Sequence, residues 1–418
     1  MKETKFKDTE IGKIPEEWEV RTINSFCSVK TGPFGSMLHA EDYVAKGTPI
    51  VTTEHFKNGI LPLVGKDIPQ IGIEDLKRMS SYTLTKDDIV FSRVGSVDIN
   101  ALVTVRQKGW LFSGRVLRVR PFKQTDSLYL HYGLLKHSVR SDIVSRAVGL
   151  TMASINTKIL GETELSLPPL NEQRRIASAL TSIDNLIASL GKLIEKKKNI
   201  KQGAMQQLLT GKTRLKGFNE PWMEHTIDEL FDLGNGYTPS KSNPAYWTNG
   251  TIPWFRMEDI RTNGRILKDS IQHITPEAVK GSGLYPKYSI ILSTTATIGE
   301  HALLIADSQA NQQFTFLNRK VNRKNMISIM FFYHYCFILG KWCRDNINAG
   351  GLLAVNMDDL KNHSIYIPKS IAEQQAIATI LTKMDDEITA LEAKRAKYEA
   401  IKQGMMQQLL TGKIRLIG

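Results

Sequence analysis

Apolar residues recur at steps of three and four along two long stretches of the chain, from about Glu172 to Leu209 and from about Glu373 to Leu409. This spacing lines one face of an α-helix. The first stripe consists of Ile176, Leu180, Ile183, Ile187, Leu190 and Ile194. The second consists of Ile377, Leu381, Met384, Ile388 and Leu391, continued by Tyr398, Met405 and Leu409. The pattern predicts two helices of about 38 residues, each roughly 57 Å long at 1.5 Å per residue.

The two stretches are copies of one segment. The chain reads KQGAMQQLLTGKTRL from Lys201 and KQGMMQQLLTGKIRL from Lys402, and the same offset separates Glu172 from Glu373. Looser similarity continues upstream of each copy. We therefore expect a pseudo-twofold duplication. A helix this long cannot bury its apolar stripe alone, so we expect it to pair with its duplicate as an antiparallel coiled coil.

Both predicted helices carry start and stop signals. Proline precedes each stretch, and Ser370 stands three residues before a glutamate, the spacing of a capping box. Gly211 and Gly412 stand where the helices are expected to end.

The remaining segments show short β-rich runs such as DIVFSRV, RVLRVRP, SIILSTT and HSIYIP, separated by Gly, Pro and Asn turn signals. Helical stretches are expected near 128–148 and 326–347. The predicted fold class is α+β, with two globular α/β domains separated by two long helices. The expected limits are 1–166 for the first domain, 167–216 for the central helix, 217–367 for the second domain and 368–418 for the distal helix.

Composition adds a preference for polyanions. The 418 residues are 41% hydrophobic and 23% charged, as in folded proteins, but the net charge is +13. Such an excess favours nucleic acid as a partner, while basicity that only aids solubility is the competing explanation. No apolar run reaches the roughly 20 residues needed to span a bilayer. Three cysteines without CxxC spacing predict reduced thiols.

Short matches to catalytic motifs are incomplete. Gly211-Lys212-Thr213 resembles the end of a phosphate-binding loop, but Gln206 stands where that motif needs a glycine. Asn243-Pro244-Ala245-Tyr246 resembles the tetrapeptide with which adenine methyltransferases hold a flipped base, but its second proline is missing. A helix terminus and a turn explain these two segments better. The nine histidines form no HExxH pattern. The sequence therefore predicts no catalytic and no metal site.

Recognition chemistry remains. Arginines lie in or beside the predicted strands with Ser, Thr, Asn and Gln, the side chains that read base edges and bind phosphates. They are Arg93, Arg115, Arg118, Arg120, Arg256, Arg261 and Arg265. A surface ion pair is the competing interpretation for each. The amide-rich run Ser308 to Gln313 suits adenine readout or a polar hairpin, and the lysines between Lys192 and Lys201 suit DNA phosphates or a solvated helix face.

Together these segments resemble the specificity subunit of a type I restriction-modification system over essentially the whole chain. The resemblance rests on NEQRRIASALTSID with KQGAMQQLLTGKTRL, on AEQQAIATILTKMD with KQGMMQQLLTGKIRL, and on YTPSKSNPAYW followed by TIPWFRMEDI (Tyr237 to Ile260). The first domain departs from the family pattern, with TGPFGSMLHAEDY where the NPxYW stretch would be.

The resemblance implies a non-catalytic, cytoplasmic DNA-binding subunit. Each target recognition domain would read one half of a bipartite, asymmetric target in double-stranded DNA, and the paired helices would fix the spacer. The helices would also dock two methyltransferase subunits, and two restriction and translocation subunits would complete the complex. S-adenosylmethionine, ATP and magnesium would bind those partners, so no cofactor is expected in this chain. The docking positions are Ile176, Leu180, Ile183, Ile377, Leu381 and Met384.

Positions that match the family's DNA-facing loops fall in both domains. In the first they are Lys30, Ser36, Thr53, Arg93 and Ser96, and in the second Thr238, Ser240, Lys241, Arg256, Thr294, Asn311 and Gln312. Two other interpretations compete with this one. A single-chain enzyme that reads and modifies DNA lacks a complete motif, and a basic coiled-coil scaffold without sequence-specific readout would bind DNA without a salt dependence.

Overall fold

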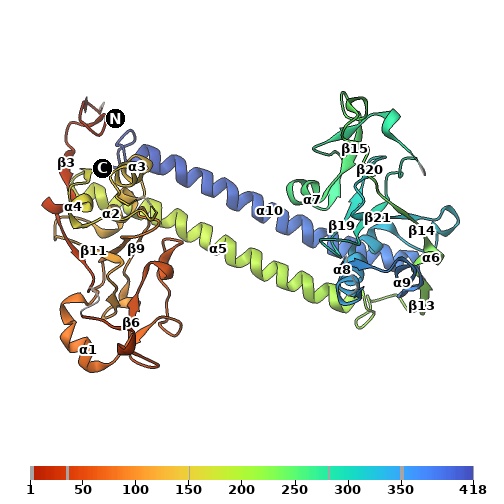
Figure 1. Ribbon diagram of the computed structural model, residues 1–418, viewed down its shortest axis with the longest axis horizontal. Helices are drawn as coiled ribbons and strands as arrows, with labels where there is room; N and C mark the ends of the chain where they lie inside the picture. Colours follow the sequence, from red (N-terminus) through yellow and green to blue (C-terminus); the bar gives the residue numbers. More distant parts are fainter. Residues whose placement is uncertain (1–3, 34–36, 150, 281–282, 349–352, 418) are drawn as a thin grey trace. The chain divides into compact units, whose positions relative to one another are not determined.

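The computed structural model describes residues 4–33, 37–149, 151–280, 283–348 and 353–417 (Figure 1). The chain forms two compact units. Unit 1 comprises Met1–Gly191 with Ala393–Gly418, and unit 2 comprises Lys192–Glu392. Each unit therefore holds one globular domain and parts of both long helices. The unit boundaries divide the helices, whereas the limits expected from the sequence separate helices from domains, and those limits stay predictions.

Unit 1 is built on a four-stranded antiparallel sheet of order β4-β11-β8-β9. Its strands are β4 (Cys27–Thr31), β11 (Val116–Pro121), β8 (Ile89–Ser92) and β9 (Asn100–Leu102). A second sheet of order β10-β6-β7-β5 contains β10 (Leu111–Phe112), β6 (Thr48–Val51), β7 (Gln70–Ile71) and β5 (Tyr43–Val44). Two ribbons pair β3 (Glu19–Thr22) with β12 (Glu164–Leu167) and β1 (Phe6–Lys7) with β2 (Ile14–Pro15). The helices are α1 (Ile73–Arg78), α2 (Ser127–Leu134), α3 (His137–Ser145) and α4 (Thr157–Gly161), with short 3-10 turns η3 (Thr53–Phe56), η4 (Ser80–Tyr82) and η5 (Val105–Gln107).

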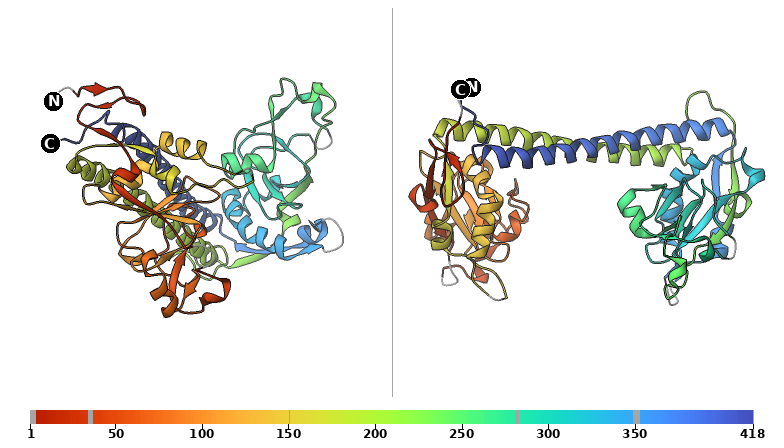
Figure 2. Two further views of the ribbon diagram at one scale, coloured as in Figure 1. Left: turned by 60° about the vertical axis from the view of Figure 1, so that its left-hand side comes forward. Right: turned by 90° about the horizontal axis from the view of Figure 1, so that it is seen from above.

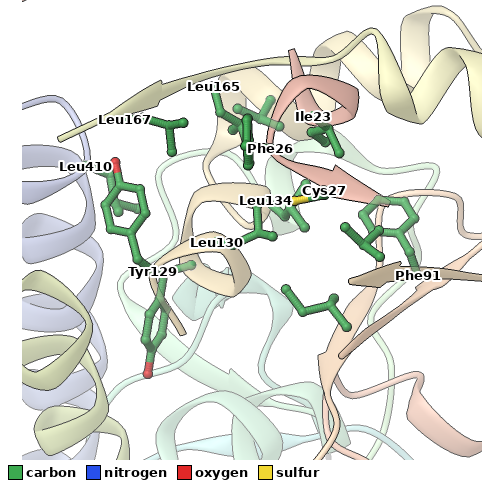
Figure 3. Close-up of a cluster of buried hydrophobic side chains, with 14 of the residues drawn as sticks. Ile23, Phe26, Cys27, Phe91, Tyr129, Leu130, Leu134, Leu165, Leu167 and Leu410 are labelled. Atoms are coloured by element: carbon green, nitrogen blue, oxygen red, sulfur yellow. The ribbon is translucent and has the colours of Figure 1, made fainter. Parts of the chain in front are cut away.

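Alternating apolar residues give the central sheet of unit 1 two buried faces. Leu117 and Val119 on β11 join the core beneath α2, whereas Val116 joins a second core with Phe112 of the other sheet. This alternation follows from the two-residue period of a strand. Figure 3 shows the first core, where Leu410 from the C-terminal segment meets side chains of the globular domain.

Unit 2 repeats this plan. A five-stranded sheet of order β14-β21-β18-β19-β16 contains β14 (Phe231–Asn235), β21 (Phe314–Arg319), β18 (Ile290–Ser293), β19 (His301–Leu304) and β16 (Ile266–Leu267). A three-stranded sheet joins β17 (His273–Ile274), β15 (Ile252–Phe255) and β20 (Gln309–Ala310). Ribbons pair β13 (Trp222–Thr226) with β24 (Ser364–Pro368) and β22 (Ile347–Asn348) with β23 (Ala354–Val355). The helices are α6 (Ile227–Leu230), α7 (Met257–Asn263), α8 (Ile329–Asp345) and α9 (Met357–Asn362).

The α+β class, the duplication and the four β-rich runs named above are confirmed. The helical stretch expected near 128–148 is interrupted and forms α2 and α3, whereas the one near 326–347 forms the single helix α8.

The two long helices are α5 (Leu170–Leu208) and α10 (Ile371–Leu409), each of 39 residues. Gly211 and Gly412 follow them with φ values of +70° and +69°, the left-handed conformation expected at a helix end. The helices pair antiparallel within each unit (Figure 2). Lys402 lies 2.6 Å from Asp184 in unit 1, and Lys201 lies 2.5 Å from Asp385 in unit 2.

The apolar stripes do more than join the two helices. Ile176 and Leu180 are fully buried in the core of the unit 1 globular domain, together with Met406 and Leu409 of α10. Unit 2 has the matching arrangement, because Ile377 and Leu381 lie in its core with Leu208 at the end of α5 and Leu209 directly after it. The beginning of each stripe therefore attaches its helix to a globular domain, and the seam expected from the sequence is only part of its role.

Each long helix has in its first turn a buried glutamate that binds an arginine and a tryptophan. In unit 1, Glu172 accepts hydrogen bonds from Trp18 Nε1 (3.1 Å) and from Arg415 Nε and Nη2 (2.7 and 2.8 Å). Glu373 of unit 2 accepts equivalent bonds from Arg214 at 3.0 and 2.6 Å and from Trp222 at 3.4 Å. These contacts explain why the repeated segment includes both the glutamate and the arginine after the terminal glycine.

Three of the lysines near the end of α5 contact α10 instead of facing solvent freely. Besides Lys201, Lys197 lies 2.7 Å from Glu387 and Lys198 lies 2.7 Å from Glu392. Their charges are compensated inside unit 2, so these three are poor candidates for DNA phosphates.

Candidate nucleic-acid interface

In unit 2, loops at one edge of the central sheet are tied together by backbone hydrogen bonds. The bonds run from the amides of Gly236, Asn311 and Thr294 to the carbonyls of Phe314, Phe255 and Gln313, with lengths of 2.9 to 3.0 Å. We call residues 236–242, 256, 294–297 and 311–313 the second rim. A Cβ at Gly236 would lie 2.3 Å from the Asn311 carbonyl oxygen, so only glycine permits this approach.

Unit 1 has the same three bonds. They run from the amides of Gly32, Ser113 and Arg93 to the carbonyls of Val116, Val51 and Arg115, with lengths of 2.9 to 3.1 Å. We call residues 32–33, 53, 93–97 and 113–115 the first rim. The two rims share a backbone framework but differ in side chains, since Ser113-Gly114-Arg115 replaces Asn311-Gln312-Gln313.

On the second rim, several predicted residues come together. Thr238 Oγ1 donates to Gln312 Oε1 (2.5 Å), and Asn311 Nδ2 donates to Gln313 Oε1 (3.2 Å). These bonds hold the amides side by side at the edge of the domain. Thr294 is only 6% exposed and its hydroxyl is bonded to that of Thr315 (3.0 Å). Thr294 therefore holds the loop, and its burial argues against a base contact.

Arg256 stands at the start of α7, beside these amides. Its Nη2 lies 2.9 Å from Glu258, and its guanidinium carbon lies 5.9 Å from the centre of the Trp254 ring. Its buried Nε has no hydrogen-bond partner among the described residues. Lys241 is exposed in the loop after β14, and Ser240 is hydrogen bonded to Ser242 (2.8 Å).

On the first rim, Arg93 is engaged by the chain itself. Its Nη1 donates to the Gly114 carbonyl (2.9 Å) and its Nε to the Ile155 carbonyl (3.3 Å). Thr53 opens η3 half-buried, and Ser96 is exposed. Ser36 lies outside the described residues. The DNA contacts of these positions stay a prediction.

Lys30 lies on β4 just before the rim. Its ammonium lies 4.1 Å from the centre of the Tyr82 ring and donates to the Ser81 carbonyl (3.1 Å). Burial, followed by the neighbouring charges of Arg118 and Arg120, lowers the pKa of Lys30.

Two polar rim residues with matching positions in the two domains are absent from the set that the resemblance implies. Arg115, exposed on the first rim, and Gln313, half-buried on the second, hold equivalent positions in the backbone framework. The register of β11 and β21, if aligned between repeats, would have indicated both. Conversely, Gln309 of the amide-rich run is fully buried and donates to the Gly283 carbonyl (2.6 Å). The first half of that run therefore lies in the interior of the domain.

Besides Arg256, two more of the candidate arginines form ion pairs, as their competing interpretation holds. Arg120 makes two bonds with Asp88, of 2.6 and 2.7 Å, and Arg265 lies 2.5 Å from Glu300. Arg261 is exposed on α7.

The six predicted docking side chains are mostly enclosed by the chain. Exposures run from 0% to 8% for Ile176, Leu180, Ile183, Ile377 and Leu381, and Met384 packs against the core of unit 2. Side chains so covered cannot touch a partner, so this part of the expectation is corrected to a core role. The exposed faces of α5 and α10 stay a predicted docking surface.

Within the described ranges, no group of three or more His, Cys, Asp or Glu side chains could hold a metal ion. The three cysteines are buried and free, and burial raises the pKa of Cys343 to about 12. No described helix is long and apolar enough to cross a membrane.

Comparisons with known proteins point to one family. The family model described as type I restriction modification DNA specificity domain matches residues 15–201 and 219–403, once in each repeat. The type I restriction enzyme EcoprrI specificity subunit of Escherichia coli is 46% identical over 173 residues, which cover 40% of this chain and 43% of that protein. The putative type I restriction enzyme MjaX specificity subunit of Methanocaldococcus jannaschii is 29% identical, and that alignment covers 99% of this chain and 98% of that protein.

A solved structure has the same fold. The S subunit of a type I restriction-modification system from M. genitalium has a TM-score of 0.59 at 16% identity, covering 94% of this chain and 96% of that one. At this identity the likeness concerns the fold alone.

Proposed function

This chain belongs to the family of type I restriction-modification DNA specificity proteins, and we propose that each of its two rims reads one half of a bipartite, asymmetric DNA target. The observation that carries this proposal is the pair of rims: one backbone framework presents two different sets of side chains. Identical rims would suit a palindrome, whereas unlike rims suit unrelated half-sites. The chain is then the specificity subunit, and catalysis belongs to its partners.

The long helices would set the distance between the half-sites. In each unit they are locked in register by a lysine and an aspartate, Lys402 with Asp184 and Lys201 with Asp385. Their exposed faces would dock two methyltransferase subunits, and two restriction and translocation subunits would join the full complex. S-adenosylmethionine, magnesium and ATP would bind those partners. We also propose a cytoplasmic location, because the DNA substrate lies there.

The first test is methylation mapping by single-molecule sequencing, in cells that carry this chain with its methyltransferase partner. We expect N6-methyladenine in both halves of one bipartite motif, lost when the chain is deleted. Methylation that ignores this chain would support the basic scaffold instead. Methyl transfer by the purified chain alone would support the single-chain enzyme.

A second test concerns the spacer. Equal insertions of whole helical turns after Gly191 in α5 and after Glu392 in α10 fall where the two units meet in sequence. They should change the unread gap and leave both half-sites unchanged. A selected target with new half-site bases and the old gap would contradict the role of the helices.

A third test concerns Arg256. If it contacts a base, Arg256→Ala should cost about 1 to 3 kcal/mol and relax one base of the second half-site. Arg261→Ala, on the exposed side of the same helix, is the matched control. Equal weakening on all sequences would reassign Arg256 to a phosphate.

A further inference from the structure

The first globular domain contains a cluster of cations that its own acids do not neutralise. Arg118 on β11 stands directly opposite Lys30 on β4, so both side chains lie on one face of the sheet. Arg120 lies on the same face, two residues along the strand. Both oxygens of Asp88, the carboxylate beside them, are bonded to Arg120. Lys30, Arg118, Arg120 and Asp88 therefore carry a net charge of about two positive units.

Arg118 is the unusual member. It is only 6% exposed, its Nε is buried without a partner, and no hydrogen bond or ion pair joins its guanidinium to the described residues. Its contact is with an aromatic face, the Phe112 ring centre lying 5.7 Å away. Burial and then the charge of Arg120 lower the pKa of Arg118. A guanidinium withdrawn from water without a partner is costly, and natural proteins seldom retain one without a use.

The fold does not require charge at this place. In unit 2, Phe314 is opposite Ser293 as Val116 is opposite Ser92, so Phe316 corresponds to Arg118. Gly234 faces Phe316 across the strand pair, where unit 1 has Lys30. Tyr285 stacks on Phe316 with ring centres 3.6 Å apart and fills the space that a side chain at position 234 would need. The same position thus holds an aromatic stack in one domain and a pair of cations in the other.

The location fits a phosphate of bound DNA. Lys30 is two residues before Gly32, which begins the first rim, or roughly 7 Å along the strand. Lysine and arginine together are the usual donors to a backbone phosphate, and a desolvated guanidinium has the stronger interaction with it. Tyr82 and Phe112, whose ring centres are 6.0 Å apart, provide apolar walls beside the cations.

We propose that Lys30 and Arg118 form a binding site for one phosphate group of the DNA backbone beside the first half-site, with no counterpart in the second domain. The inference rests on the proposed DNA-reading function and adds an asymmetry to it. The first domain is anchored by a buried phosphate contact, whereas the second relies on its rim.

The test is the salt dependence of DNA binding by the full chain assembled with its methyltransferase subunits, on a duplex with the mapped target. The double variant Lys30→Met with Arg118→Met should make the negative slope of log K against log salt shallower by about 0.9, the value for one phosphate. A fourfold rise in salt should then weaken the wild type about 3.5-fold more than the variant. Lys123, an exposed lysine beyond the other end of β11, provides the matched control. Lys123→Met should leave the salt dependence of DNA binding as it is in the wild type.

A second measurement locates the phosphate. Single methylphosphonate substitutions beside the first half-site should weaken the wild type at one position and leave the double variant unaffected there. Arg118→Met should not lower the melting temperature, because no ion pair is lost, whereas Arg120→Met should lower it by breaking the bonds to Asp88. A loss for Arg118→Met as large as that for Arg120→Met would overturn the inference by assigning Arg118 to stability.

The remaining outcomes are distinct. An unchanged slope in the double variant, while the wild type still prefers its target, overturns this inference alone. An altered base preference assigns Arg118 to base readout and also overturns it. Protection from heat by inorganic phosphate that the variant loses, with the DNA slope unchanged, would mean a free anion site instead of a DNA contact. A wild-type complex without target preference would overturn the proposed function itself.

Discussion

Replacing Glu373 by glutamine should destabilise unit 2 by about 2 to 3 kcal/mol. The carboxylate is fully buried and accepts two bonds from Arg214 and a longer one from Trp222. Breaking a buried ion pair by removing one partner costs about 3 to 5 kcal/mol. Arg214 remains 29% exposed and regains part of its hydration, which lowers the expected loss.

Unit 1 offers a matched comparison with the same chemistry. Arg415, the partner of Glu172, is only 6% exposed and has the additional bond to Glu17. Glu17 is 68% exposed and compensates the Arg415 charge only in part, and that charge is less accessible to water than the charge of Arg214. Glu172→Gln should therefore cost more, about 3 to 4 kcal/mol. Both substitutions remove the same group at the same position of the repeat, so the difference between them reflects the surroundings of the two arginines, their burial and the bond to Glu17.

The assay must resolve the units, since a chain with two of them need not unfold in one step. Native-state hydrogen exchange of β13 and β24 reports on unit 2, and that of β3 and β12 on unit 1. Adding Arg214→Met to Glu373→Gln should recover about 1 kcal/mol by removing the unpaired charge. Any of three results would refute this reasoning. The first is a decrease in the free energy of unfolding of less than about 0.5 kcal/mol for Glu373→Gln. The others are no recovery in the double variant and a greater cost for Glu373→Gln than for Glu172→Gln.

Three further outcomes follow from single positions. Burial lowers the pKa of His334 to about 3, so below pH 6.5 the unfolded chain binds a proton that the folded chain does not. As the pH falls, this group should lower the stability of unit 2 by up to about 1.4 kcal/mol per pH unit. His334→Tyr, which copies Tyr132 of α2, should make the free energy of unfolding less dependent on pH in denaturation experiments from pH 7 to 5, and an unaltered pH dependence would exclude the neutral imidazole. Ala296 has a φ of 57°, a left-handed conformation that glycine adopts without strain. Ala296→Gly should therefore raise the free energy of unfolding by about 1 kcal/mol. A decrease measured by urea titration would speak against strain at Ala296. Gly412→Ala should destabilise unit 1 by about 2 kcal/mol or more, because the φ of Gly412 is +69° and a Cβ there would lie 2.4 Å from a proline ring. Gly191→Ala should instead stabilise α5 by about 1 kcal/mol, because a Cβ there would have nothing within 4 Å. Similar melting temperatures for the two variants would contradict this contrast.

The sequence was sufficient for the long helices because their signals are local. The 3.6-residue period, the prolines before them and the glycines after them define α5 and α10 to within two residues of the structure. The family resemblance and the duplication are confirmed as well. The capping box expected at Ser370 is only half present: the Glu373 amide lies 3.4 Å from Ser370 Oγ, but the carboxylate binds Arg214. That partner is 159 residues distant, and no local pattern indicates it.

The candidate site was predictable in its chemistry and less so in its geometry. The amides at Asn311 and Gln312 do stand at a rim, since polar residues between two apolar strands must lie at a sheet edge. Burial could not be read from composition, and it separates Gln309 and Thr294, which face inward, from their neighbours. Arg118 was one basic residue among many until the strand register placed it opposite Lys30.

The division of unit 1 between Met1–Gly191 and Ala393–Gly418 imposes an order on synthesis. A ribosome completes unit 2, whose residues are contiguous, before it has made the last segment of unit 1. Until then Glu172 lacks Arg415 and the first core lacks Leu410, a residue more than 200 positions later than most of that core. Contacts of such separation form slowly, because loop closure precedes any gain from packing. The first domain to emerge is therefore the last to mature, and a nascent chain that stops early leaves its beginning unfinished while its middle is already folded.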